Sequence, residues 1–378
     1  MRCASFTTLV IAVGMTLLVS CNNAPPTSKP AAVGAGRVLV VVNGRSESSI
    51  AVGNYYAARR GIAPSHVVRV NVPAEDEISE LSFLSDIVRP VRTAIEALPV
   101  RIDFIVLTTG VPIRVGGNRG NSVDAGLAGM NLAIPPMVGL DTLWLARYRN
   151  PYFGSLQPFD SDRFGIFLVT RLDCMRVADC LALVDRSIAA RPLRGPFFFD
   201  ATPPSESATG YGAMNRSLYA AAFRLHFAGL DVELDSTTRF VAPREAVMGY
   251  ASWGSNDGSF DNRTYHDIRF LPGALAETFV STSARTFGAA DGGQSRIADL
   301  IAQGVTGVKG YVSEPYTVAL ADPEILFDRY LRGFTLAEAF YAASRMVLWK
   351  DVVVGDPLCA PYAIGVEPMG PRLGVLPR

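Results

Sequence analysis

The sequence predicts an α/β protein in which helices flank a mainly parallel β-sheet. Short β-branched runs alternate along the chain with segments of helical periodicity, and connections of this length favour βαβ units. In addition, 49% of the 378 residues are hydrophobic and 19% are charged, which is the balance of a folded chain with a large core. We expect two α/β halves, residues 37–164 and 165–365, followed by a tail at 366–378.

The elements of the first half follow from local patterns. The run Val-Leu-Val-Val-Val at 38–42 is typical of a strand buried on both faces. A helix is predicted where apolar positions recur with helical spacing, and Gly61 ends it. In order, we expect a strand at 38–42, a helix at 48–60, a strand at 66–72, a helix at 81–98 and a strand at 104–107.

Residues 110–160 lack a persistent period and are rich in Gly, Asn, Pro and aromatic residues. A long loop region of this kind after a strand is a usual place for a binding surface.

The alternation of strands and helices then resumes. We expect strands at 165–170, 196–199, 229–234, 246–250, 278–282, 305–312 and 352–354, and helices at 175–190, 214–227, 295–302, 323–332 and 336–347.

The first twenty residues predict a lipoprotein signal peptide. Arg2 precedes an apolar run at 6–19 that is too short to span a bilayer comfortably, and Leu18-Val19-Ser20-Cys21 resembles a bacterial lipobox. Cys21 would then carry the lipid, and the Pro- and Gly-rich stretch at 21–36 would be a tether. The alternative is an ordinary signal peptide that is cleaved nearby. We expect a lipid-anchored protein of the bacterial cell envelope, at the outer membrane or the periplasmic face instead of in the cytoplasm. Asn22, which follows Cys21 in place of Asp, favours the outer over the inner membrane.

Charge and residue counts limit the classes of partner. The 35 basic and 35 acidic residues leave no excess to neutralise phosphates, so nucleic acid is not an expected partner. Three histidines would all be needed for one multi-histidine metal centre, and five cysteines are too few for a disulfide scaffold. We expect no cofactor apart from one alternative, calcium.

Two loops are rich in ligand-type residues. Gly116–Ser122 follows a strand end but lacks the lysine or the helix of a phosphate-binding loop, so a mobile surface loop is the better interpretation. The loop at 255–262 contains Asp257 and Asp261, whose oxygens could bind calcium. Its spacing is not that of an EF-hand, and Asn and Asp beside Gly also form ordinary turns.

Cysteine and histidine give two further candidate sites. Cys174 and Cys180 could form a local disulfide if their Cα atoms lie within ~7 Å, or remain two buried thiols. His266 is the histidine placed among polar groups, and Ser281 and Ser283 follow at sequence distances of 15 and 17. A His266–Ser281 or His266–Ser283 pair, with Asp257, would make a nucleophile and its base.

Several segments in the second half resemble gingipain-type cysteine peptidases. They are Phe-Leu-Val-Thr-Arg-Leu at 167–172, Leu-Val-Asp-Arg-Ser at 183–187, Phe-Phe-Asp at 198–200, Gly-Phe-Thr-Leu-Ala-Glu-Ala at 333–339 and Val-Gly-Asp-Pro at 354–357. The opening of the chain further resembles an uncharacterised family of exported bacterial proteins distantly related to those peptidases. The resemblance implies a caspase-like α/β fold, which in those peptidases carries a histidine–cysteine dyad.

The resembled dyad is not retained. Trp253 stands at the position that matches the histidine, and Ser283 stands, within a residue, at the position that matches the cysteine. The indole N–H of tryptophan only donates, so Trp253 cannot accept a proton. A serine without an adjacent base is a poor nucleophile at neutral pH.

Three hypotheses about function follow. The leading one is a lipid-anchored protein with a degenerate caspase-like fold that binds a peptide, a glycan or an envelope protein without catalysis. The second is a peptidase-like hydrolase with a rewired Ser281 or Ser283 and His266. The third is a purely structural component of the cell surface, which predicts no concave polar pocket between residues 110–160 and 250–290.

Overall fold

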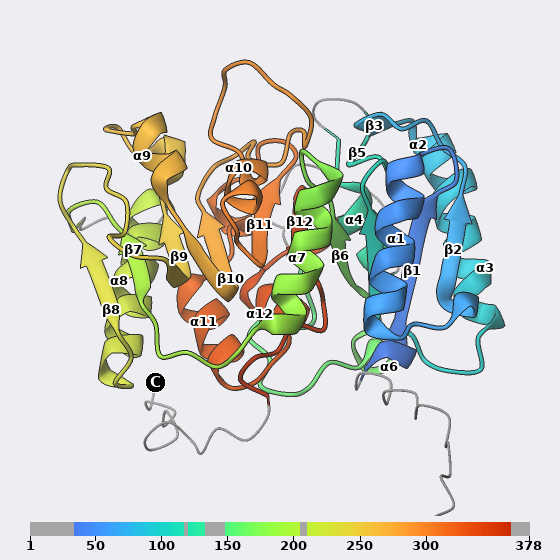
Figure 1. The fold of residues 1–378 in the computed structure, drawn as a ribbon, viewed down its shortest axis with the longest axis horizontal. Helices are drawn as coiled ribbons and strands as arrows, with labels where there is room; N and C mark the ends of the chain where they lie inside the picture. Colours follow the sequence, from blue (N-terminus) through green and yellow to red (C-terminus); the bar gives the residue numbers. More distant parts are fainter. Residues whose placement is uncertain (1–33, 117–119, 133–147, 205–209, 364–378) are drawn as a thin grey trace, which may run out of the picture. The chain divides into compact units, whose positions relative to one another are not determined.

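The computed structural model describes residues 34–116, 120–132, 148–204 and 210–363. Ten strands form one continuous sheet (Figure 1). The signal peptide, Cys21, most of the predicted tether and the predicted tail lie outside the described residues. The strands are β1 (Val38–Asn43), β2 (Val67–Val70), β4 (Phe104–Thr108), β6 (Leu168–Leu172), β7 (Phe197–Asp200), β8 (Val232–Asp235), β9 (Val247–Ser252), β10 (Phe270–Thr278), β11 (Gly307–Tyr311) and β12 (Asp351–Gly355).

The strand order in the sheet is β2-β1-β4-β6-β12-β11-β10-β9-β7-β8. Every pair of neighbouring strands in this order is parallel except β11 and β12, which run antiparallel to each other. The predicted α/β fold with a mainly parallel sheet is therefore confirmed. The last strand in sequence lies in the middle of the sheet, between strands from the earlier and the later parts of the chain. A separate two-stranded sheet pairs β3 (Glu77–Ile78) with β5 (Arg114–Val115).

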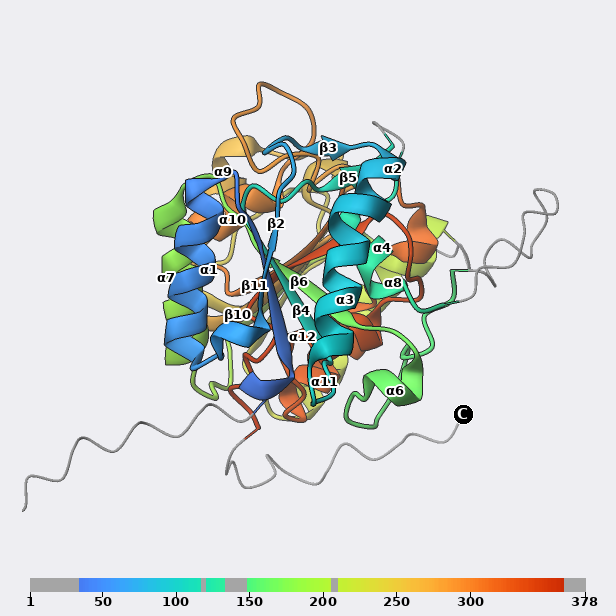
Figure 2. The ribbon, with the colours of Figure 1, turned by 90° about the vertical axis from the view of Figure 1, so that its right-hand side faces the viewer.

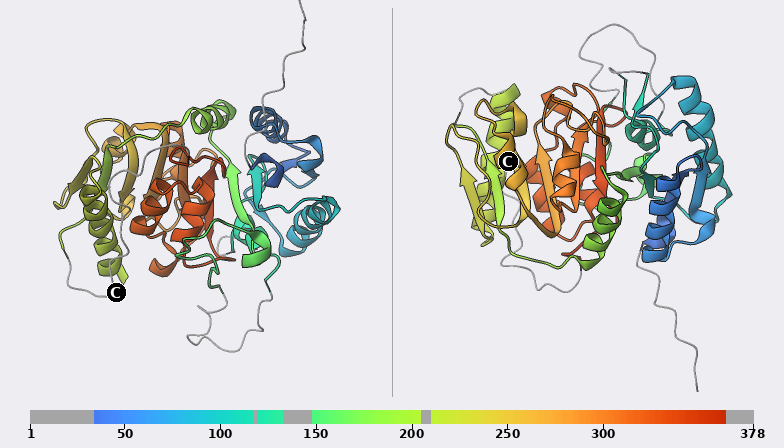
Figure 3. Two further views of the ribbon diagram at one scale, coloured as in Figure 1. Left: turned by 90° about the horizontal axis from the view of Figure 1, so that it is seen from below. Right: turned by 45° about the horizontal axis from the view of Figure 1, so that its top comes forward.

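Helices cover both faces of the sheet, as the views in Figures 2 and 3 show. One layer contains α1 (Glu47–Arg60), α7 (Val177–Ala189) and α10 (Ile297–Ala302). The other contains α3 (Arg89–Ala97), α4 (Val123–Ala128), α8 (Gly210–Phe227), α11 (Pro323–Leu331) and α12 (Leu336–Ala343). Shorter helices are α2 (Glu80–Ser82), which continues into a π-helical segment at Phe83–Val88, α6 (Ser161–Phe164) and α9 (Asn262–Asp267).

Local chemistry explains the element boundaries. β1 is buried along its whole length, as a β-branched run between two helix layers requires. The side chain of Ser46 caps the start of α1, and Gly61 ends it with a φ of 68°. Thr335 and Glu338 form a capping box at the start of α12. These polar caps satisfy backbone groups that the helix ends leave free.

One strand differs from the prediction in a way that affects the site. The sequence predicted a strand at 278–282, but β10 ends at Thr278 and begins at Phe270. Pro272 and Gly273 concealed its first half because neither residue is typical of a strand. The pairing with β9 shifts register between Phe270 and Leu275, so these residues form an irregularity within the strand. Ser281 and Ser283 therefore follow the strand instead of lying in it.

The parallel strands define two edges of the sheet. At the carboxyl edge the chain leaves β2, β4, β10 and β11, and loops after these strands meet there. At the opposite, amino edge the described chain begins, since Gly34 lies four residues before β1. Ligands of open α/β sheets favour the carboxyl edge. Among the described residues, no helix has both the length and the apolarity needed to cross a membrane.

Candidate ligand-binding cavity

A cavity of about 900 Å³ opens at the carboxyl edge. This volume lies within the usual range of small-molecule sites. Its walls come from segments far apart in sequence, which the loops after β2, β4, β10 and β11 and the chain before β12 bring together. The residues that line this carboxyl-edge cavity are Asp76, Arg114, Thr282, Arg285, Thr286, Ala290, Val312, Ser313, Glu314, Tyr316, Trp349 and Lys350.

One wall joins the end of β11 to the start of β12. The indole N–H of Trp349 donates to the carbonyl of Pro315 at 2.9 Å. The Ser313 hydroxyl and the Lys350 ammonium both donate to the carbonyl of Gly120, at 3.3 and 3.0 Å. This wall therefore presents the Trp349 ring and the Lys350 ammonium group, and both are hydrogen-bonded to backbone carbonyls.

Tyr316 adopts a backbone conformation that is costly for its residue type. Its φ of 62° and ψ of 156° lie in a region that is essentially restricted to glycine. Leu348, directly before Trp349, also has a positive φ of 61°. In the described part of the chain these two are the non-glycine residues with positive φ; Tyr316 lines the cavity, and Leu348 precedes the lining residue Trp349. Such strain costs about 1–3 kcal/mol per residue and is typical of functional sites.

A buried polar network holds the loop that carries Tyr316. Lys309 donates to the carbonyl of Ala319 at 3.0 Å and lies 3.4 Å from the Asp351 carboxylate. Glu277 accepts from the Tyr311 hydroxyl at 2.7 Å and from the backbone N–H of Ala321 at 3.3 Å. Burial raises the pKa of Glu277 to about 8, against the opposing effect of Lys309. The loop is thus fixed from below at two points, which is how strained backbone persists.

The opposite wall carries two arginines. The guanidinium of Arg114 binds Oε1 of Glu77 through Nη2 at 2.6 Å and Nε at 3.1 Å, and it also donates to the carbonyl of Arg285. The side chain of Arg285 donates to the carbonyls of Thr282, Gln294 and Gly292 at 3.2, 2.7 and 2.8 Å. Within the described ranges, no carboxylate forms an ion pair with Arg285.

Burial lowers the pKa of Arg285, and the nearby charge of Arg296 lowers it further. Burial also lowers the pKa of Lys350. Both effects have the same origin, since removing a cation from water disfavours its charged form. Two carboxylates, Asp76 and Glu314, line the same cavity. The cavity therefore presents charges of both signs together with the hydroxyls of Thr282, Thr286 and Ser313.

The predicted serine–histidine pair is not brought together. The Ser283 side chain is fully buried and accepts from the backbone N–H of Tyr311 at 3.4 Å. His266 lies on α9, where Nδ1 is 2.7 Å from the carbonyl of Asn262 and Nε2 is 3.9 Å from Asp299. No hydrogen bond in the described chain joins His266 to Ser281 or Ser283. Thr282, between the two serines, lines the cavity.

Trp253, at the position that matches the resembled histidine, is a packing residue. It is 4% exposed, and its ring meets that of Phe279 edge-on at a centroid distance of 5.1 Å. Its indole N–H donates to Oδ1 of Asn215 at 3.1 Å. That N–H already has a hydrogen-bond partner inside the fold, and the indole has no acceptor for a proton. Trp253 therefore stabilises the core and does not act as a base.

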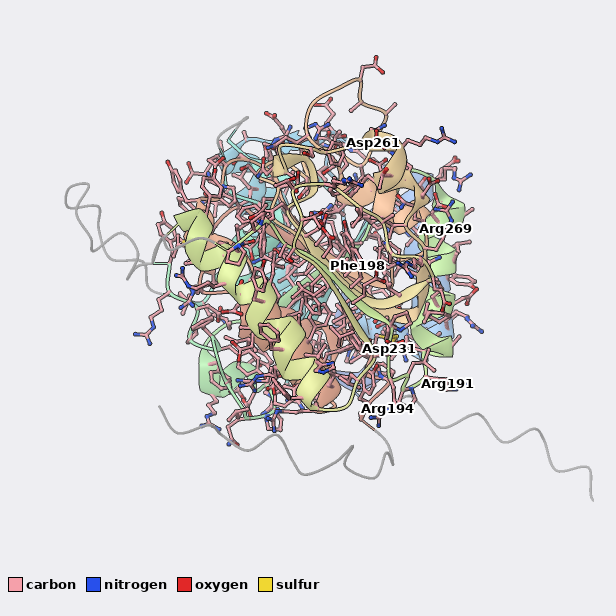
Figure 4. All side chains as sticks on the ribbon, turned by 90° about the vertical axis from the view of Figure 1, so that its left-hand side faces the viewer. Arg191, Arg194, Phe198, Asp231, Asp261 and Arg269 are labelled. Atoms are coloured by element: carbon pink, nitrogen blue, oxygen red, sulfur yellow. The ribbon has the colours of Figure 1, made fainter. Side chains whose placement is uncertain are left out.

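The two candidate calcium ligands have local roles. Asp261 caps α9 by accepting from the N–H of Thr264 at 2.7 Å, and this hydrogen bonding lowers its pKa. Figure 4 shows Asp261 beyond the carboxyl end of the strand that carries Phe198. Asp257 accepts from the N–H of Ser259 at 2.6 Å. Within the described residues, no group of three or more His, Cys, Asp or Glu side chains is arranged to hold a metal ion.

Cys174 and Cys180 are buried and free in the structure, and so is Cys359. Burial raises the pKa of Cys174 well above its usual value, and a hydrogen bond with Cys180 raises it further. The two thiols are therefore neighbours, as a local disulfide would require, but no disulfide joins them in this structure. Cys21, the predicted lipid-bearing residue, lies outside the described residues.

Sequence reasoning anticipated the place of the cavity better than its residues. The rule that ligands favour the carboxyl edge, and the loop-rich stretch at 110–160, both pointed toward Arg114. Arg285, Tyr316 and Trp349 were missed because each follows or precedes its strand in a separate loop. The available signal was the polar and aromatic run Ser-Glu-Pro-Tyr at 313–316, directly after a predicted strand.

Comparisons with known proteins complete the description. No family model matches the sequence, and no curated protein matches it. Among solved structures, the chain is similar to one described as a protease, with a TM-score of 0.47 and 11% identity. The match covers 86% of this chain and 78% of the other. It is a similarity of α/β fold, and the gingipain-type resemblance of the sequence remains a prediction.

Proposed function

We propose that this protein is a non-catalytic binding protein of the bacterial cell envelope, with a degenerate caspase-like fold, that holds a small ligand in the carboxyl-edge cavity. The observation that carries the proposal is the strained Tyr316, a residue that lines the cavity and is 57% exposed. A costly conformation at an exposed position makes sense where the side chain meets a ligand. The cavity also argues against a purely structural component of the surface.

The absence of turnover in this proposal rests on the surroundings of the candidate groups. Ser283 is buried against Tyr311, and His266 faces Asn262 and Asp299 instead of a serine. Thr282 lines the cavity, but its hydroxyl donates to Oε1 of Gln294 at 2.7 Å, and an amide oxygen is not a base. In the described chain, none of these three candidate groups therefore combines access to the cavity with an adjacent base.

The test is a binding screen with a cavity-filling variant. Purified protein is screened by thermal shift against short peptides and oligosaccharides, and Thr286→Trp is compared with Ser236→Trp. Thr286 lines the cavity, whereas Ser236 is exposed in the loop after β8. We expect ligands that raise the melting temperature of the wild type and of Ser236→Trp, but not of Thr286→Trp. Ligands that stabilise all three proteins equally would place binding elsewhere.

The rewired hydrolase is the competing outcome. A phosphonate probe directed at serine nucleophiles should leave Ser281 and Ser283 unmodified, and bound peptides should be recovered intact. Labelling of either serine, lost in His266→Ala, would overturn the non-catalytic assignment.

A further inference from the structure

The charges around the carboxyl-edge cavity narrow the chemistry of its ligand. Among the described residues, five charged side chains line it: Arg114, Arg285 and Lys350 are cationic, and Asp76 and Glu314 are anionic. Arg114 is already neutralised by Glu77. The remaining four described groups are two cations and two carboxylates. The described lining therefore favours neither a purely anionic nor a purely cationic ligand.

Each wall of the cavity carries both a cationic and an anionic side chain. On the wall between β11 and β12, Lys350 donates to the carbonyl of Gly120, as does Ser313, the residue before Glu314. The Glu314 carboxylate accepts from the N–H of Tyr316 on the same wall. On the other wall, Asp76 and Arg285 are linked through Arg114, whose backbone N–H donates to the Asp76 carbonyl and whose side chain donates to the Arg285 carbonyl. A ligand spanning the cavity would meet a cation and a carboxylate at each side.

Two of these groups have capacity left for a ligand. Oε1 of Glu314 accepts from the N–H of Tyr316 at 3.0 Å, which leaves Oε2 without a partner among the described residues. The side chain of Arg285 donates to backbone carbonyls in the described chain and forms no direct ion pair there. A carboxylate arriving at Arg285 would form a charge-assisted hydrogen bond in a partly desolvated place.

The aromatic rings of Tyr316 and Trp349 complete the pattern. Rings of this type attract ammonium groups through their faces and also pack against apolar side chains. Lys350 already lies 4.9 Å from the centre of the Trp349 ring. The backbone N–H of Tyr316 binds the Glu314 carboxylate, so an aromatic residue and a carboxylate follow one another on this wall, where a ligand ammonium group could meet both.

We infer that the cavity takes a zwitterionic short peptide, which presents its carboxylate to Arg285 and its ammonium group to Glu314 and Tyr316. This inference rests on the proposed binding function and specifies its ligand. A neutral glycan would leave Arg285 and Glu314 desolvated without compensation, and an acidic glycan would place its carboxylates against Glu314 and Asp76. Of the expected ligand classes, a peptide matches both signs.

The experiment uses a pool of random tripeptides in four forms: free, N-acetylated, C-amidated and blocked at both ends. Binding to the full chain is measured by thermal shift and isothermal titration. We expect the free form to bind at least about tenfold more tightly than the doubly blocked form, because each end loses a hydrogen bond to a charged group. Equal binding of the free and doubly blocked forms would overturn the inference.

Substitutions of Glu314 and Arg285 test which residue binds the amino end of the peptide and which binds its carboxyl end. Glu314→Gln keeps an acceptor for Tyr316 and should weaken peptides with a free amino end about tenfold, without effect on acetylated ones. Arg285→Gln should weaken peptides with a free carboxylate and spare the amidated form, and Arg285→Lys should restore part of the loss. Glu233→Gln and Arg239→Gln, exposed and outside the cavity lining, are the matched controls.

Two kinds of failure are distinguishable. If neutral disaccharides bind to the wild type and not to Thr286→Trp, with no effect of Arg285→Gln, the cavity is a binding site but the peptide inference is wrong. If neither peptides nor sugars bind in a way that Thr286→Trp abolishes, the proposed function itself is wrong. Equal losses for blocked and free peptides in Arg285→Gln would indicate a folding defect of the 282–294 loop, and would contradict the assignment of the carboxylate to Arg285.

Discussion

Asp200 ends β7 with a carboxyl group that is 1% exposed and whose two oxygens have no hydrogen-bond donor in the described structure. Burial raises its pKa to about 8, and the charges of Asp257 and Asp235 raise it further. The group is therefore held in its neutral form in the folded protein at neutral pH, whereas an unfolded aspartate ionises near pH 4.

The sign of the resulting pH dependence is clear. Because the folded pKa lies above the unfolded one, the contribution of Asp200 to stability is fully present below pH 4 and is lost as the pH rises toward 8. We predict that Asp200→Asn, which keeps a neutral side chain of similar shape, removes this loss. Its free energy of unfolding relative to the wild type should increase between pH 5 and pH 8, by at most about 1.4 kcal/mol per pH unit.

Urea denaturation at several pH values measures this effect. Asp261→Asn is the informative control, because Asp261 is an exposed helix cap whose pKa is lowered. Asp261 is ionised in both the folded and the unfolded protein above pH 5, so its substitution should change stability by an amount that stays constant from pH 5 to pH 8. A constant difference between Asp200→Asn and the wild type from pH 5 to pH 8 would show that Asp200 is already ionised or solvated.

Cys174 and Cys180 give a second prediction at this scale. Both are buried, and the pKa of Cys174 is raised by burial and by its neighbour, so the reactive thiolate is scarce in the folded protein. We predict that maleimide does not modify either thiol in the native protein and modifies both after unfolding without a reductant. Modification that requires a reductant even after unfolding would instead establish the disulfide.

At the scale of elements, the predictable parts of the fold were those with a continuous local pattern. β1 and α1 were predicted closely because a β-branched run and a capped, glycine-terminated helix carry their own signals. The predicted position of β10 was wrong because Pro272 and Gly273 interrupt the local strand pattern. In the fold, the Gly273 N–H donates to the Thr306 hydroxyl. Tertiary contacts, which no local window contains, complete such a strand.

The loop that presents Tyr316 shows the same limit and yields a test. Nothing in Ser-Glu-Pro-Tyr indicates that Tyr316 has a φ of 62°, because the network of Glu277, Tyr311 and Lys309 imposes it from distant strands. We predict that Tyr316→Gly is more stable than Tyr316→Ala by about 1–3 kcal/mol. Both variants lack the ring, so the difference isolates the strain of the backbone.

Both variants should also lose affinity for the cavity ligand to a similar extent, since each removes the same ring. Chemical denaturation and ligand titration on the same preparations separate the two effects. Equal stability of Tyr316→Gly and Tyr316→Ala would mean that the loop relaxes to an ordinary conformation, and would remove the main support for the site.

At the scale of the whole molecule, the sheet brings together residues that the sequence keeps apart. Arg114, Arg285 and Trp349 are separated by more than sixty residues each, yet they line one cavity because β4, β10, β11 and β12 lie within one sheet. The antiparallel insertion of β12 next to β11 places Trp349 beside the end of that strand. Such an arrangement depends on strand order, so composition and spacing could predict the edge but not the residues.

The same architecture separates the cavity from the start of the domain. The cavity lies at the carboxyl edge, and Gly34 enters β1 from the amino edge. If Cys21 carries a lipid, twelve residues, 22–33, join it to the described chain. Twelve residues span at most about 40 Å when fully extended. Anchoring would thus hold the amino edge near the bilayer and leave the carboxyl edge open to ligands.

We therefore predict that lipid attachment does not change ligand affinity. Protein carrying its lipid in vesicles and a chain beginning at residue 22 should bind the same tripeptide pool with dissociation constants within about twofold, or ~0.4 kcal/mol. The shorter chain is a fair comparison because residues 32–378 form a compact unit of their own. Cys21→Ser should abolish incorporation of labelled palmitate and release the protein from membranes. A tenfold loss of affinity on anchoring would mean that the cavity faces the bilayer, and that the tether runs past the amino edge instead of ending there.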